Sequence, residues 1–518
     1  MRVRWLFGGS LAAAVLALIL ALPSSAPFSG DNGLRLWAAR SGTGTLLRAL
    51  PEEVPSTAFP PALTRPGRSG LRPAYGELMP ALLSLGGLLR SPLAWRLLLG
   101  LISLAAIPLL GVLAGTGGAP VYLAAGLLPY SLLFWEHGPA VSLFLLAAVL
   151  LVRSLRGPSA PWWIPVAALA IRLRPELLPA TAAMVAVVVG GGRKLPGFRT
   201  TLVWSAGAAG LAALGALLLP DVVVGRQILA NQPSVSGGWL TARISVLSAW
   251  TLPLKPDTGA SLLLWGLGSA VLLCGAHGRR IRRLALTCGL AGGLALLYPV
   301  ARGTAGSMSI LSLTPAIVLL PAGAYCAKWR HLTILRAGAA GATLVFLLSP
   351  TAGMFQFGPR FLLGSLSLLA AGGAGALLSI PNRKLKAASI CLALLLSALG
   401  AARGAAFCGY FRRTHQVLSE SLERHDGDVV CTDEEWMPLV CWAQAVRGPL
   451  LVMRPDQAES LHSAGMPVVW LSSRTALGGM RGESGFRGLR YSLPRGSSRC
   501  LPPAPPGELA PDPPLLGI

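Results

Sequence analysis

Four short segments of the chain place acidic, imidazole and guanidinium side chains within otherwise apolar sequence. The segments are FSGDNGLRLWAAR (28–40), PYSLLFWEHGPA (129–140), IRLRPE (171–176) and MFQFGPRF (354–361). Their polar members are Asp31, Tyr130, Glu136, His137, Arg172, Arg174, Glu176, Gln356 and Arg360. A carboxylate can accept a proton from a hydroxyl, paired arginine N–H groups can hold a phosphate, and a Glu-His pair offers ligands to a divalent metal. The set therefore predicts acid-base and phosphate chemistry.

The elements that must position these residues are apolar helices. Of the 518 residues, 53% are hydrophobic and only 12% are charged. Runs of about eighteen apolar residues recur along most of the chain, and each is long enough to cross about 30 Å of hydrocarbon as a helix. The sequence therefore predicts an all-α polytopic protein of the inner (plasma) membrane.

The formal charge of +24, from 44 Lys plus Arg against 20 Asp plus Glu, suggests nucleic acid in a soluble protein. Here the basic residues fall in short clusters between apolar runs, which is typical of topology determinants, so we expect no nucleic-acid partner. The clusters lie at 153–156, 193–199, 279–283, 328–336 and 383–386. If each marks the cytoplasmic side, two spans lie between neighbouring clusters, and the count comes to about 13 helices.

The first apolar stretch, about 6–22, is either a cleaved signal peptide or an uncleaved first helix. In both cases Asp31 emerges on the extracytoplasmic side, in a first outer loop of about 23–96. This loop carries several Arg residues, but the positive-inside bias weakens in loops of this length.

Residues 162–190 test the topology, because they form one long apolar stretch with Arg172, Arg174 and Glu176 near its middle. A single span would bury three charges near the bilayer centre and would move every later basic cluster to the outside. We therefore expect two short helices that meet at RLRPE. With this hairpin, acidic, imidazole and guanidinium groups converge on the outer side, while the inner side shows mainly basic clusters.

The order GDNGLRLW, PYS…FWEH, RLRPE and QFGPRFLL resembles bacterial membrane glycosyltransferases of the C-type fold (GT-C), relatives of protein O-mannosyltransferases and of lipid A aminoarabinose transferases. The resemblance covers about residues 1–405. It implies that Asp31 is the catalytic base. The family often has two acidic residues in the first outer loop, whereas Asn32 stands beside Asp31 here.

The resemblance also implies roles for the later segments. Glu136 would be the acid of the second loop, with His137 beside it as a further ligand if a divalent metal ion binds. Binding of the donor phosphate and substrate would fall to Arg172, Arg174, Arg360, Tyr130 and Gln356.

The expected activity is that of an inverting glycosyltransferase with a polyprenyl-phosphate sugar as donor. Such a donor needs a base for the acceptor hydroxyl, cations for the leaving phosphate and a bilayer for its tail. The acceptor would be a glycan, a lipid or a protein outside the cytoplasm. Two alternatives stay open: a lipid-linked sugar flippase or transporter, and a non-catalytic assembly protein for cell-envelope polysaccharide.

Simpler roles exist for several of the candidates. Asp31 is a favoured residue type for capping the helix that NGLRLWAAR begins. Glu136 and His137 are adjacent, so on a helix they point about 100° apart, and a shared metal would need a loop. Arg360 can snorkel to lipid headgroups, and Arg172 can pair with Glu176 at helical spacing.

The last part of the chain differs in composition from residues 1–404. Short β-branched runs alternate with helical stretches over 405–499, which predicts a small extracytoplasmic α/β domain with a parallel sheet. We expect it to cover the active site or to select the acceptor. Three of its Cys residues and the first residue of the tail could form up to two disulfides outside the cytoplasm: Cys408, Cys431, Cys441 and Cys500. The Pro-rich tail, 500–518, is predicted to be disordered.

Overall fold

The computed structural model describes most of the helical part of the chain and the strands near its end. The described residues are 9, 11–16, 64–67, 70–73, 92–132, 137–157, 160–218, 241, 243, 244, 246, 247, 256–302, 309–348, 360–423, 429–432, 450–452, 455–463, 468–472 and 486–490. Three of the predicted site residues, Asp31, Glu136 and Gln356, lie outside them.

Six helical segments among the described residues are long and apolar enough to cross a membrane. They are Leu97–Ala114, His137–Ser154, Arg279–Ala301, Trp329–Leu348, Arg360–Leu377 and Arg383–Ala406. Large apolar side chains such as Leu211 and Val203 are exposed on the helix surfaces, as expected for helices in contact with lipid. The helical, membrane-spanning character predicted from the sequence is thus supported, while the count of about 13 spans stays a prediction.

The first described helices are short and interrupted. They are α4 (Pro92–Leu104), α5 (Ala106–Ala114), α6 (Gly118–Ala124) and α7 (Leu128–Leu132), followed by the longer α8 (His137–Ser154). The α5–α6 turn is tight: a Cβ on Gly118 would lie 1.7 Å from the carbonyl oxygen of Ile107, so only glycine fits there.

The predicted hairpin at RLRPE is confirmed. Helix α9 (Trp163–Leu173) ends directly before Arg174, and α10 (Leu177–Gly191) begins directly after Glu176. Arg174 is extended, with φ −141° and ψ 94°, as expected for a residue that precedes a proline. Pro175 therefore ends one helix and lets the chain turn into the next. Helix α11 (Phe198–Leu218) follows.

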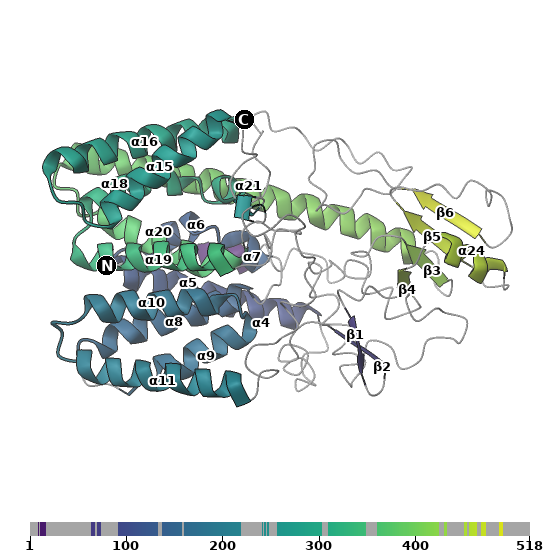
Figure 1. Ribbon diagram of the computed structural model, residues 1–518. Coiled ribbons are helices and arrows are strands. Elements are labelled where there is room, and N and C mark those ends of the chain that lie inside the picture. The colour runs from purple at the N-terminus through teal and green to yellow at the C-terminus, as the bar shows by residue number, and fades with distance from the viewer. Residues whose placement is uncertain are drawn as a thin grey trace.

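The second half of the bundle contains longer helices. They are α15 (Pro256–Leu273), α16 (Arg279–Ala301), α17 (Ile310–Leu313), η2 (Pro315–Leu319), α18 (Leu320–Cys326), α19 (Trp329–Leu348), η3 (Arg360–Leu362), α20 (Leu363–Leu377) and α21 (Arg383–Glu423). Glycines allow close packing: a Cβ on Gly338 of α19 would lie 2.9 Å from Leu369 of α20. In Figure 1 the helices lie side by side, and α21 continues past them toward the strands.

Several basic connectors meet at one end of this bundle, which we call the basic end. A Cβ on Gly192 would lie 2.8 Å from Leu155, and a Cβ on Gly191 would lie 3.7 Å from Trp329, so the ends of α8 and α10 and the start of α19 are neighbours. Arg336 Nε donates a hydrogen bond to the Leu273 carbonyl at 2.6 Å, so the end of α15 lies beside the first turns of α19. Four of the five predicted inner connectors thus share one end.

The described strands form two sheets. Strands β1 (Thr64–Gly67) and β2 (Gly70–Pro73) pair antiparallel. Near the end of the chain, four strands are parallel in the order β4-β3-β5-β6. These are β3 (Val429–Thr432), β4 (Leu450–Val452), β5 (Val468–Ser472) and β6 (Phe486–Arg490), with α24 (Pro455–Ser463) between β4 and β5. The bounds of the predicted α/β domain and its side of the membrane stay predictions.

Candidate functional site

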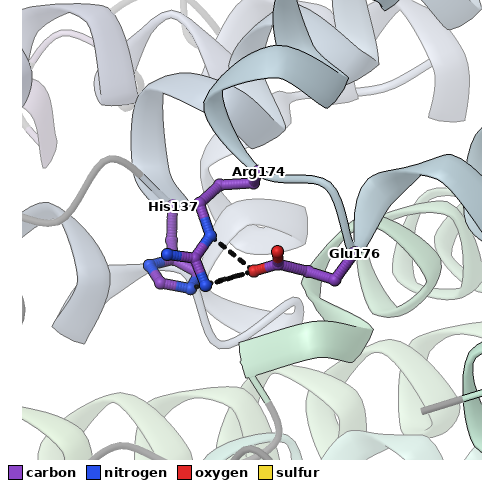
Figure 2. A network of polar contacts seen from close by, with 3 residues as sticks. All are labelled: His137, Arg174 and Glu176. Atoms are coloured by element: carbon purple, nitrogen blue, oxygen red, sulfur yellow. Dashed lines mark hydrogen bonds and ion pairs between the residues drawn. The ribbon is translucent and has the colours of Figure 1, made fainter. Parts of the chain in front are cut away.

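One carboxylate oxygen joins an arginine and a histidine at the end of the bundle opposite the basic end. Arg174 Nε donates a hydrogen bond to Glu176 Oε1 at 2.5 Å, and Arg174 Nη2 contacts the same oxygen. His137 Nε2 lies 3.4 Å from this oxygen. Figure 2 shows the imidazole and the guanidinium approaching Glu176 from the same side. At 3.4 Å, the His137 contact is longer than a usual hydrogen bond, and it is an ion pair when the imidazole is protonated.

The three side chains reach one point because each stands at a helix terminus. His137 is the first residue of α8, Arg174 directly follows α9, and Glu176 directly precedes α10. Glu176 makes no side-chain capping hydrogen bond to its own helix, although its charge lies near the favourable N-terminal dipole. Its carboxylate is directed instead at Arg174 and His137.

The cluster is largely removed from solvent. The exposed fractions of the side chains are 2% for His137, 8% for Arg174 and 13% for Glu176. Burial by itself raises the pKa of the Glu176 carboxyl, but the Arg174 charge and the contact with His137 outweigh it and lower this pKa to about 2. Glu176 is therefore a carboxylate at neutral pH and a weak base, suited to positioning its partners.

Tyr130 extends the cluster from α7. Its side chain is buried, and its ring centroid lies 6.0 Å from that of His137, with the planes inclined at 44°. Arg360 lies near enough for its positive charge to act on the Tyr130 phenol. We call Tyr130, His137, Arg174, Glu176 and Arg360 the polar cluster.

Arg360 enters from the other half of the chain. It begins η3, directly before α20, and its guanidinium carbon lies 5.5 Å from the ring centroid of Phe361. Such stacking holds a guanidinium plane in place while its edge can still donate hydrogen bonds. Helix α21 closes the same region, since Cys408 Sγ donates to the Pro129 carbonyl at 3.9 Å.

The structure thus gathers four of the residues singled out in the sequence: Tyr130, His137, Arg174 and Arg360. Arg172 stands at the end of α9 with an exposed side chain, and the ion pair of Glu176 is with Arg174. The proposed roles of Asp31, Glu136 and Gln356 stay predictions, because these residues lie outside the described part of the chain.

Glu176 is the member of the cluster that was not assigned a role in the site from sequence. Its rarity could have identified it, because between Glu77 and Glu420 the only acidic residues are Glu136, Glu176, Asp221 and Asp257. An acid so rare in an apolar region is costly to keep and therefore marks a specific partner.

The described residues hold no group of three or more His, Cys, Asp and Glu side chains placed to bind a metal ion. His137 directs Nε2 at Glu176, and Glu136 lies outside the described residues, so a metal shared by Glu136 and His137 stays a prediction.

Comparison with known proteins adds no relative. Protein-family models, curated proteins and solved structures all give no match to this chain. The class defined by the described residues is a helical protein with six candidate membrane spans and a polar cluster at one end of its bundle.

Proposed function

We propose that the chain is an integral membrane glycosyltransferase that transfers a sugar from a polyprenyl-phosphate donor to an extracytoplasmic glycan, lipid or protein. Asp31 takes the proton of the acceptor hydroxyl as that oxygen attacks the anomeric carbon, and the lipid phosphate leaves with inversion at the sugar. The membrane is the inner (plasma) membrane, and the site faces away from the cytoplasm.

The observation that carries the proposal is the convergence of the polar cluster at the end opposite the basic end. Tyr130, His137, the Arg174–Glu176 turn and Arg360 come from four separate places in the sequence, yet they lie close to one another in the folded chain. A donor with its tail in the bilayer presents its phosphate at this depth, where the helices end.

The geometry favours a different role for each charged residue of the cluster. Arg174 is committed to Glu176 by two N–H groups, so its charge is largely balanced. Arg360 lies near the phenol of Tyr130 rather than near a carboxylate of the cluster. Its stacked guanidinium is therefore the better candidate to bind the leaving phosphate. The low pKa of Glu176, about 2, makes it a poor general base, which leaves that role to Asp31.

The topology supports the same arrangement. Short helices in sequence, α4 with α5 and α6 with α7, each add up to one interrupted span, so the described helices are compatible with about 13 spans. If the basic end is cytoplasmic, the polar cluster is extracytoplasmic. Residues 405–499 then form an outer α/β domain that covers the site or selects the acceptor.

The test uses purified full-length protein in liposomes with a panel of radiolabelled polyprenyl-phosphate sugars and a range of acceptors. Release of the free lipid phosphate is measured for wild type, Asp31→Asn and Arg360→Gln, with and without EDTA. Arg302→Gln is the matched control, since Arg302 ends α16 and stacks on Tyr298 outside the cluster.

Release by wild type and by Arg302→Gln, but not by Asp31→Asn, is the expected result, and the EDTA arm decides whether a metal is needed. Movement of the donor across the bilayer without release of lipid phosphate would replace the enzyme with a transporter. Absence of both would leave a polysaccharide-assembly role.

A further inference from the structure

A second group of charges lies at the basic end, around the C-terminus of α5. Arg330 Nη2 donates a hydrogen bond to the Val112 carbonyl at 2.7 Å, so the start of α19 is fixed to the end of α5. Arg156, which follows α8, is near enough for its charge to act on Arg330. Lys328 and Arg330 act in the same way on His331. We call Arg156, Lys328, Arg330 and His331 the basic cluster.

The two connectors that carry the basic cluster contain no acidic residue of their own. Of the four acids between Glu77 and Glu420, Glu176 belongs to the polar cluster and Asp257 stands at the start of α15, while Glu136 and Asp221 lie outside the described residues. Like charges held together are unfavourable unless an anion joins them. An anion bound from outside the protein would supply the counter-charge that these connectors lack.

Two nitrogen atoms of the cluster are open to a ligand, and the one on Arg330 is always a donor. Arg330 Nε and His331 Nδ1 are buried and have no hydrogen-bond partner among the described residues. A buried donor without a partner carries a desolvation cost that a bound acceptor removes. The position of Arg330 is fixed by the α5 carbonyl, so this donor is preorganised.

An apolar cavity of about 200 Å³ opens beside the cluster. It lies between α6, α18, α20 and α21, and its lining includes Val121, Leu320, Leu366, Ala374 and Ile390. Its edge is close to the basic cluster, because its lining includes Thr116, and Ala114, two residues earlier, lies beside the same glycine of α20 as His331 does. A Cβ on that glycine, Gly375, would lie 2.5 Å from His331 Cδ2.

The depth of the cluster matches that of lipid headgroups. Trp162 and Trp329 are exposed by 66% and 56% at helix starts of the same end. Exposed Trp side chains at helix ends are typical of the interface between hydrocarbon and water. A phosphate at this level and an alkyl chain in the adjoining cavity would belong to one molecule.

We propose that the basic end binds one anionic glycerophospholipid, with its headgroup phosphate at Arg156, Lys328 and Arg330 and one acyl chain in the cavity of α6, α18, α20 and α21. Charge complementarity favours an anionic headgroup over a zwitterionic one, because the cluster contributes only positive charge. This site is separate from the polar cluster and is independent of the glycosyltransferase proposal.

The test measures retention of phosphatidylglycerol by full-length protein in phosphatidylcholine nanodiscs, with native mass spectrometry as the readout. One variant combines Arg156→Gln with Lys328→Gln and keeps Arg330, which fixes α5. Its matched control combines Arg383→Gln with Lys384→Gln, which removes the same charge from exposed residues at the start of α21. We expect about thirtyfold weaker retention for the first pair, as for two cations at an anionic surface, and little change for the second.

A second pair of variants tests the cavity. Gly373 lies in its lining, and a Cβ there meets no atom within 4 Å, so the side chain of Gly373→Leu starts in open space and extends from the wall of the cavity. Gly210→Leu on α11 is the control, since a Cβ on Gly210 also meets nothing within 4 Å. We expect Gly373→Leu to lower phosphatidylglycerol retention at least tenfold and Gly210→Leu to leave it unchanged.

Four results would overturn the proposal. They are equal loss with both pairs of charge variants, equal retention of phosphatidylcholine, full retention by Gly373→Leu, and displacement of phosphatidylglycerol by polyprenyl phosphate or by inorganic phosphate. The first two remove the specific anionic site, the third removes the acyl chain from the cavity, and the last replaces the occupant.

Discussion

Glu176 Oε1 accepts a hydrogen bond at 2.5 Å from Nε of Arg174, which lies only two residues earlier. The intervening Pro175 prevents a continuous helix, so the two charged side chains fold back onto one another at the turn. The same oxygen faces His137 from α8, so a local turn is tied to a helix that begins 37 positions earlier in the sequence.

Glu176→Gln should destabilise the protein by about 3 kcal/mol, because Arg174 is left as a largely buried charge without its carboxylate. Arg172→Gln in the same hairpin is the control and should change the free energy of unfolding by less than about 0.5 kcal/mol, since that side chain is exposed. Denaturant unfolding in detergent micelles measures both. Equal stability of the two variants would show that the ion pair contributes nothing.

The contribution of Glu176 should depend on pH in a definite direction. Its pKa falls from the ordinary 4.5 to about 2 in the folded protein, so its stabilisation is fully present above pH 4.5 and is lost as the pH falls toward 2. The stability difference between wild type and Glu176→Gln should therefore be constant near neutral pH and should shrink below 4.5. A difference that grows on acidification would contradict this assignment.

Asp31→Asn should lower turnover at least a hundredfold, the usual contribution of a general base, while the protein remains folded and inserted. Glu53→Gln is the control, because Glu53 is another acid of the same predicted outer loop. The measurement is the rate of release of lipid phosphate at saturating donor. Near-full activity of Asp31→Asn would remove this residue from the mechanism and would leave helix capping as its role.

Arg360→Gln should lower kcat/KM for the donor about tenfold to a hundredfold, the loss expected for one hydrogen bond to a charged group. Arg360→Lys should recover part of it, because a lysine keeps the charge but not the stacked plane over Phe361. Initial rates over a range of donor concentrations separate KM from kcat. Unchanged kinetics in both variants would assign Arg360 to lipid headgroups instead.

Gly338→Ala should destabilise the contact between α19 and α20 by about 1 to 3 kcal/mol. The added Cβ would lie 2.9 Å from the Leu369 backbone nitrogen and 2.9 Å from the Ser365 carbonyl oxygen, neither of which can move away easily. Gly373→Ala is the control on α20, where a Cβ meets no atom within 4 Å and a helix former is favoured over glycine. Thermal unfolding of the two variants makes the comparison.

Charge patterning predicted the hairpin at RLRPE, because three charges near the bilayer centre are too costly for a single span. It did not predict that Glu176 would pair with Arg174 rather than with Arg172. Spacing of four residues on a helix favours the Arg172 pair, but Pro175 ends the helix and redirects the carboxylate. At a turn, the backbone angles decide which two side chains meet. The spacing of residues in the sequence does not specify these angles.

Contacts between distant segments were also beyond the sequence. Tyr130 and Arg360 are separated by 230 positions, and the approach of η3 to α7 depends on how α20 packs in the bundle. The sequence identified both residues by type and by their predicted side, but only the folded chain brings them together. Interruptions such as the one between α4 and α5 were likewise hidden within one apolar run.

Helix α21 extends over 41 residues, from Arg383 to Glu423. At about 1.5 Å per residue it is roughly 60 Å long, about twice the thickness of the hydrocarbon layer. The apolar window ends at Ala406, so the rest of α21 carries the chain beyond the hydrocarbon layer as a continuous helix. Each residue inserted into this part would turn the C-terminal end of the helix by about 100° and move it by about 1.5 Å along the helix axis, so the length of α21 sets where, and in which direction, the chain leaves the helix.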